Sequence, residues 1–110
     1  MPPSGSKALP QVFLSRRFRS EYFDKLRAFS ELKVHKGESA PSFSVYRRAV
    51  KNVRVVIPMV EDHIDADFMD AAPGLALVAN FGVGFDNIDL AAATERGILA
   101  TNTPGAVVGP

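Results

Sequence analysis

A glycine-rich turn holds the residues best suited to bind a small ligand. Gly82-Val83-Gly84 follows an apolar run over 75–79 that has the character of a buried strand. In open α/β sheets, ligands bind at the loops that follow the carboxyl ends of strands. Because glycine has no Cβ to shield the backbone, the N–H groups of Val83 and Gly84 could hold a small anion. The alternative is that the glycines only supply the dihedral angles of a tight turn.

These glycines do not complete a dinucleotide-binding fingerprint. The G-x-G-x-x-G pattern requires a third glycine where this chain has Asn87, and an acidic residue about twenty positions farther on, where it has Val107. The fingerprint also follows the first strand of a βαβ unit, whereas this turn follows the fourth expected strand. We therefore assign no cofactor-binding residue to this chain.

The polar and aromatic residues around the turn have local explanations. We interpret Asp86 and Asn87 as side chains that close the turn, because Asx residues do so readily. Asp89 has the position of a helix cap, so we do not interpret it with Asp86 as an acid–base pair. Phe81 and Phe85 could belong to the core or to a pocket wall, and we favour the core for Phe81.

A second loop should lie near the turn. Residues 58–62 follow the clearest expected buried strand, 53–57, which is rich in β-branched residues, and strand ends of a parallel sheet share one edge. The alternative is an ordinary strand-end loop. Glu61, Asp62 and His63 match the spacing of no compact metal site, so we interpret them as a solvated loop and predict no metal.

Five strands alternating with four helices must position these loops. Apolar spacing and caps predict strands over 11–15, 32–35, 53–57, 75–79 and 98–101, and helices over 20–29, 41–50, 66–72 and 90–96. Such alternation is typical of a parallel sheet with helices on both faces. Three residues are expected N-caps and one glycine an expected helix end: Ser20, Asp65, Asp89 and Gly97.

Two expected helices carry an apolar face. In the first, the face is formed by Tyr22, Phe23, Leu26 and Phe29. In the second, Pro41 lies near the start and the face is formed by Phe43, Tyr46, Ala49 and Val50. Pro58 cannot donate to a sheet ladder, so the third strand should end around Ile57.

The segment "VANFGVGFDNIDLAAATERGILATNTPG", residues 78–105, resembles a known family. It is similar to the end of the substrate-binding domain of D-isomer-specific 2-hydroxyacid dehydrogenases. Within that family, its sequence most resembles the glyoxylate/hydroxypyruvate reductase branch. The resemblance continues more weakly over residues 10–74, including "DADFMDAAPGL". It implies a flavodoxin-like, doubly wound parallel sheet of five strands, in the order 2-1-3-4-5 and incomplete at the C-terminus.

The resemblance implies a role for each loop. The backbone amides of Val83 and Gly84 would hold the carboxylate of a 2-oxo acid, and Met59 and Val60 would form the apolar rim of the pocket. The complete enzyme would be a homodimer that passes a hydride from NADH or NADPH to glyoxylate, hydroxypyruvate or a similar 2-oxo acid. Its catalytic histidine, acidic partner and arginine lie later in the family's chain. No catalytic role therefore falls to the two histidines of this chain, His35 and His63.

The resemblance also divides the chain. We expect a disordered tail over residues 1–9, a substrate-binding domain over 10–105 and a truncated hinge over 106–110, with the nucleotide-binding domain absent. Beyond Gly105 the chain departs from the family's pattern, which has a threonine and an aspartate in place of Val108 and Gly109. The isolated chain should then bind no cofactor and be inactive. The alternative is a non-catalytic domain that binds small carboxylates or a protein partner.

Composition agrees with a small globular domain. The chain has 110 residues, a net charge of +1 and no cysteine. The charge gives no reason to expect nucleic acid as a partner, and disulfides and thiolate sites are excluded. No apolar run approaches the length of a membrane span, so we expect no membrane association and a cytoplasmic location.

Overall fold

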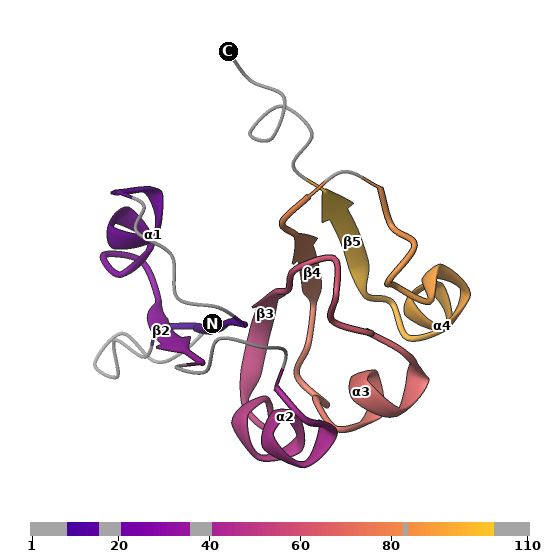
Figure 1. Cartoon of the computed structure of the whole chain (residues 1–110). Helices are drawn as coiled ribbons and strands as arrows, with labels where there is room; N and C mark the ends of the chain where they lie inside the picture. Colours follow the sequence, from indigo (N-terminus) through magenta and orange to yellow (C-terminus); the bar gives the residue numbers. More distant parts are fainter. Residues whose placement is uncertain (1–8, 16–20, 36–40, 83, 103–110) are drawn as a thin grey trace.

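The computed structural model describes residues 9–15, 21–35, 41–82 and 84–102. Its centre is a parallel five-stranded sheet in the order β2-β1-β3-β4-β5 (Figure 1). The strands are β1 (Gln11–Leu14), β2 (Glu31–Val34), β3 (Val53–Ile57), β4 (Leu77–Asn80) and β5 (Leu99–Asn102). The predicted flavodoxin-like order is confirmed. The apolar β3 lies in the middle of the sheet, and it ends before Pro58 as expected.

Four short helices connect the strands: α1 (Glu21–Leu26), α2 (Phe43–Ala49), α3 (Ala66–Asp70) and α4 (Leu90–Glu95). Helix α3 contacts both α2 and α4, whereas α1 lies apart from them, near β2 (Figure 1). The β1-to-β2 connection crosses the sheet in the opposite direction from the later ones. Right-handed crossovers therefore place α1 on one face and α2, α3 and α4 on the other.

Three helix ends in the described ranges are fixed by the residues expected there. The carboxylate of Asp65 accepts from the Phe68 N–H at 3.0 Å, and that of Asp89 accepts from the Ala92 N–H at 3.0 Å. Gly97 follows α4 with φ +69°, the left-handed conformation that commonly ends a helix. Ser20, the remaining expected cap, lies outside the described residues.

The two predicted aromatic helix faces were partly wrong. Helix α1 ends at Leu26, whose carbonyl accepts from the Ser30 hydroxyl at 2.7 Å, and Phe29 is 72% exposed beyond it. Helix α2 begins after its N-cap Ser42, so that Phe43 opens the first turn and is 47% exposed. The side chains of Tyr22 and Phe23 lie outside the described part of the chain.

The core lies between the central strands and α2, α3 and α4. Register brings Phe13, Val56 and Val78 side by side on this face, and each is buried. Tyr46 of α2 packs edge-on between Phe13 and Phe68, with ring centroids 5.4 and 4.7 Å apart. The aromatic stack therefore joins β1, α2 and α3. No helix in the described ranges has the length and apolar character needed to span a membrane.

An exposed ion pair joins α3 to the end of α4. The Arg96 Nε lies 2.9 Å from Asp70 Oδ1. The hydrogen bond from Arg96, with a smaller contribution from its charge, holds the pKa of Asp70 below its ordinary value of 3.8. The same hydrogen bond raises the pKa of Arg96.

We expect Asp70→Asn to lower stability at neutral pH and to lose its effect in acid. A carboxylate with a lowered folded-state pKa stabilises the fold above its unfolded pKa, and this contribution disappears as pH falls through the folded pKa. The effect should be small, because solvent screens exposed pairs. Urea unfolding of both chains between neutral pH and pH values below 3.8 measures it. A difference that does not change with pH would contradict the assignment.

Candidate functional site

The loops after β3 and β4 meet at the carboxyl edge of the sheet. Met59 pairs with Phe81 as an isolated bridge, and the Phe81 N–H donates to the Pro58 carbonyl at 2.8 Å. Val60 lies directly over Gly82, since a Cβ placed on Gly82 would be 2.7 Å from Val60 Cγ1. The expected proximity of the two loops is confirmed. Val60 remains 49% exposed and so presents apolar surface beside the turn.

Asn80 holds the glycine turn at both ends. Its carbonyl accepts from the Gly82 N–H at 3.1 Å, and its side-chain amide donates to the Gly84 carbonyl at 3.0 Å. Gly82 and Gly84 have φ values of +154° and +84°, so the glycines serve the turn's dihedral angles as well.

Gly84 leaves a backbone donor open at this edge. Its N–H makes no hydrogen bond to any residue in the described ranges, and a Cβ placed on Gly84 would have no heavy atom within 4 Å. Val83, the other predicted carboxylate-binding residue, lies outside the described residues, and its role stays a prediction. Gly84 is half-buried at a strand end, and a backbone N–H without a partner among the described residues is a donor that a small anion can bind.

Asn87 does more than close the turn, which was the only role predicted for it. Its side chain is buried and donates to two carbonyls of the loop after β3, those of Met59 at 3.1 Å and Asp62 at 2.9 Å. It also forms a reciprocal amide pair with Asn80, at 2.9 and 3.1 Å. The Asn87 carbonyl accepts from the Ile64 N–H at 2.8 Å. Asn87 therefore connects the two candidate loops.

Asp62 is not solvated, and this prediction was also wrong. Its residue is 1% exposed, and Oδ2 accepts from the Ser15 hydroxyl at 2.6 Å and from the Met59 N–H at 2.8 Å. Ser15 follows β1, so the network reaches a third strand end. No role for Ser15 or Asn80 was predicted from the sequence. The signal that could have found them is a polar residue directly after an apolar run, because strands that end there lie at the ligand-binding edge of the sheet.

The remaining residues around the turn take separate positions. Phe81 is half-buried and does not belong to the core cluster, whereas the sequence analysis favoured the core for it. Phe85 packs against that cluster. Asp86 is exposed, and Asp89 caps α4. The cap formed by Asp89 is the role that its position in the sequence predicted.

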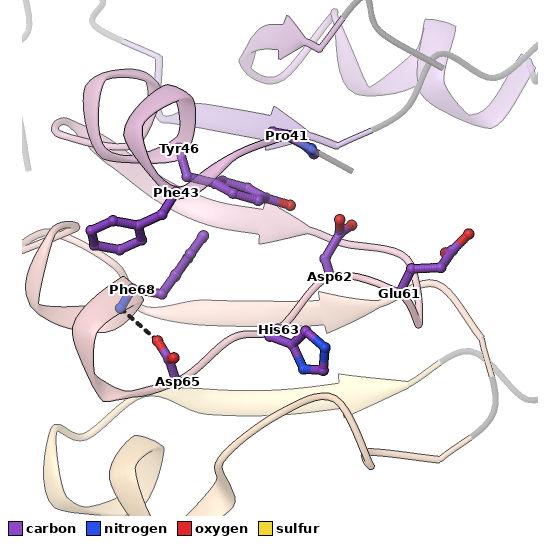
Figure 2. A pocket seen from close by; sticks show the side chains of 8 residues that line it. All are labelled: Pro41, Phe43, Tyr46, Glu61, Asp62, His63, Asp65 and Phe68. Atoms are coloured by element: carbon purple, nitrogen blue, oxygen red, sulfur yellow. Dashed lines mark hydrogen bonds between the residues drawn. The ribbon is translucent and has the colours of Figure 1, made fainter. Parts of the chain in front are cut away.

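A pocket of about 230 Å³ lies on the α2 and α3 side of the same loop. Figure 2 shows its lining: Pro41, Phe43, Tyr46, Glu61, Asp62, His63, Asp65 and Phe68. Its carboxylates already have structural partners at two positions, since Asp62 accepts from Ser15 and Asp65 caps α3. Within the described ranges, no cluster of three or more His, Asp or Glu residues could hold a metal ion. We place the candidate site at the glycine turn rather than here, because the open donor is there.

The residues after the turn do not fit a dinucleotide phosphate. A phosphate would occupy the N-terminus of the following helix, and in α4 the carboxylate of Asp89 already accepts from the Ala92 N–H. A phosphate at that position would meet a negative charge. Asn87, at the place of the third fingerprint glycine, is buried with its side chain engaged.

Comparison with known proteins agrees with the fold. Residues 12–108 match the catalytic domain of D-isomer specific 2-hydroxyacid dehydrogenases. The chain therefore belongs to this family. It is 42% identical over 96 residues to a glyoxylate reductase of Korarchaeum cryptofilum, covering 87% of this chain and 29% of the relative. A glyoxylate reductase of Thermococcus litoralis is 36% identical over the same share of each chain.

Solved structures give the same result. The TT0316 protein of Thermus thermophilus is similar with a TM-score of 0.81 and 42% identity, over 86% of this chain and 30% of that one. An NADPH-dependent glyoxylate/hydroxypyruvate reductase of Sinorhizobium meliloti, solved with NADP and malonate, is similar with a TM-score of 0.70 and 27% identity. The match covers 88% of this chain and 29% of that one. The chain spans under a third of the length of these relatives.

We expect Gly82→Ala to destabilise the chain by about 1–3 kcal/mol, because a Cβ would meet Val60 and a non-glycine residue is strained at this φ. Gly74→Ala is the matched control, since its Cβ would meet only ordinary contacts at 3.7 and 3.9 Å. Its effect should stay within about 0.5–1 kcal/mol of zero. Urea unfolding measures both variants, and equal losses would contradict the close approach of Val60.

Proposed function

We propose that residues 10–105 form the substrate-binding domain of an NAD(P)-dependent D-2-hydroxyacid dehydrogenase that reduces glyoxylate, hydroxypyruvate or a similar short 2-oxo acid. The observation that carries the proposal is the meeting of an open backbone donor, at Gly84, with an exposed apolar side chain, Val60, at one strand edge. Membership of the family and the relatives named glyoxylate reductase support it.

The two loops divide the recognition of a 2-oxo acid. Gly84, together with Val83, would donate backbone N–H groups to the carboxylate, which keeps its charge at neutral pH. Such donors suit a small anion, because they add no steric bulk and do not titrate. Met59 and Val60 would contact the carbon skeleton. The malonate in the Sinorhizobium meliloti reductase supports a small carboxylate as a ligand for this fold.

The cofactor and the chemistry belong to other parts of such an enzyme. In the complete enzyme, NADH or NADPH would supply the hydride and a histidine the proton. His35 and His63 do not take that role in our proposal, and the residues around α4 do not fit a dinucleotide phosphate. This chain would then provide one wall of the substrate site, within an enzyme that we infer to be a cytoplasmic homodimer.

We expect glyoxylate to bind the chain weakly, because a single wall makes few contacts. A dissociation constant near or above ~1 mM corresponds to about −4 kcal/mol. Amide shifts of the ¹⁵N-labelled chain, followed during titration, should be largest in residues 59–62 and 81–86. Glycolaldehyde, which lacks the carboxylate, is the control and should cause no saturable shift. Larger shifts in another region would disprove the site assignment.

We also expect the isolated chain to show no reduction of glyoxylate by NADH or NADPH. Hydride transfer requires donor and acceptor carbons in near-attack geometry, and one wall of a cleft cannot hold both. Absorbance of the reduced cofactor is the measurement. Turnover that falls when Gly84 is replaced by alanine would show that this chain is a complete catalyst, and the proposal would have to be abandoned.

A further inference from the structure

A continuous chain of hydrogen bonds runs beneath the two proposed substrate-binding loops. It begins at Ser15 after β1, passes through Asp62 in the loop after β3, and reaches Asn87 through the Asp62 carbonyl. From Asn87 it continues to Asn80 at the end of β4 and from there to the Gly84 carbonyl. All four side chains that carry it are buried. This hydrogen-bond network therefore connects the ends of β1, β3 and β4 beneath the two loops.

Asn87 is the member that joins the loop after β3 to the turn after β4. Its Nδ2 lies 2.9–3.1 Å from three acceptors: the carbonyls of Met59 and Asp62 and the Oδ1 of Asn80. Its Oδ1 accepts from the Asn80 amide at 2.9 Å. Only a carboxamide of this length offers both the donors and the acceptor. Aspartate lacks the N–H groups, and alanine lacks both.

The contacts of Asn87 fix the parts of each loop that the proposed substrate would touch. The Met59 carbonyl precedes Val60 directly, so the hydrogen bond from Asn87 orients the peptide that carries Val60. On the other side, Asn80 bonds to Asn87 and to the Gly84 carbonyl with the same amide. A shift of Asn87 would therefore move the rim and the turn relative to each other.

We propose that Asn87 is a positioning residue for substrate binding, which sets the separation between the Gly84 N–H and the Val60 side chain. This inference rests on the proposed function. A ligand as small as a short 2-oxo acid can contact both groups only at a narrow range of separations, because it has no flexible length to adapt. Preorganised loops of this kind depend on the hydrogen bonds behind them. Asn87 does not contact the ligand and acts through Met59 and Asn80.

The test compares Asn87→Ala with a variant of similar instability that leaves the edge intact. Val53→Ala is the matched control: Val53 is fully buried at the amino end of β3, away from both loops. Glyoxylate is titrated into the full 110-residue chain in each form, and affinity is taken from the amide shifts of residues 59–62 and 84. Urea unfolding of both variants establishes that their losses of stability are comparable.

We expect Asn87→Ala to weaken glyoxylate binding about fivefold or more, and Val53→Ala to change it less than about twofold. If Asn87→Ala does not fold, Asn87→Ser replaces it, since its hydroxyl can still donate to one carbonyl, and about a threefold weakening is expected. Unchanged binding by the folded Asn87 variant, or equal weakening by Val53→Ala, would overturn the positioning role of Asn87 but leave the proposed function intact. Absence of saturable binding by the wild-type chain would overturn the proposed function, and this inference with it.

Discussion

The hydrogen bonds of Asp62 and Asn87 are the constraint on which the carboxyl edge depends. Both residues are buried, and a buried carboxylate or amide is costly unless its polar atoms are paired. Partners come from other segments: the Ser15 hydroxyl for Asp62, and the Met59 carbonyl and the Asn80 amide for Asn87. Because these segments follow three different strands, the polar groups are satisfied only when the loops take one arrangement. The same bonds that remove the cost of burial therefore fix the site.

The apolar core and the polar edge have separate tasks. Packing of Tyr46 against Phe13 and Phe68 joins strands to helices but would tolerate small shifts of the loops beyond them. Hydrogen bonds are directional and allow less freedom. At the edge, the loop after β3 is held to the turn after β4 at Met59 and Phe81 by bridge pairing, and again at Asn87 by its side chain. Loops without regular structure thus acquire a defined geometry.

Sequence patterns predicted the helices and strands well because their positions and caps follow from local signals, whereas the strand order was implied by the family resemblance. The apolar run of β3, the cap residues Asp65 and Asp89 and the glycine at the end of α4 each occupy the expected place. Asn87 and Asp62 were misinterpreted because some of their partners lie 25–47 positions away. No local pattern distinguishes such contacts from an Asx turn or a solvated loop. Phe29 failed for a local reason: its N–H bonds to the Leu26 carbonyl in a tighter i+3 turn, and the Ser30 hydroxyl bonds to the same carbonyl, so that α1 ends before Phe29.

A site built from backbone donors makes particular demands on its surroundings. An arginine or lysine can adjust to a misplaced carboxylate because its side chain is long, whereas the Gly84 N–H can only point where the turn directs it. The turn contains glycines at positive φ, and glycine has more conformational freedom than other residues, so the turn cannot maintain its own shape. Asn80 closes it from below through the Gly84 carbonyl, and Asn87 fixes Asn80. In our proposal, the conformational freedom that opens the Gly84 donor to a ligand is thus limited by buried amides that do not contact the ligand.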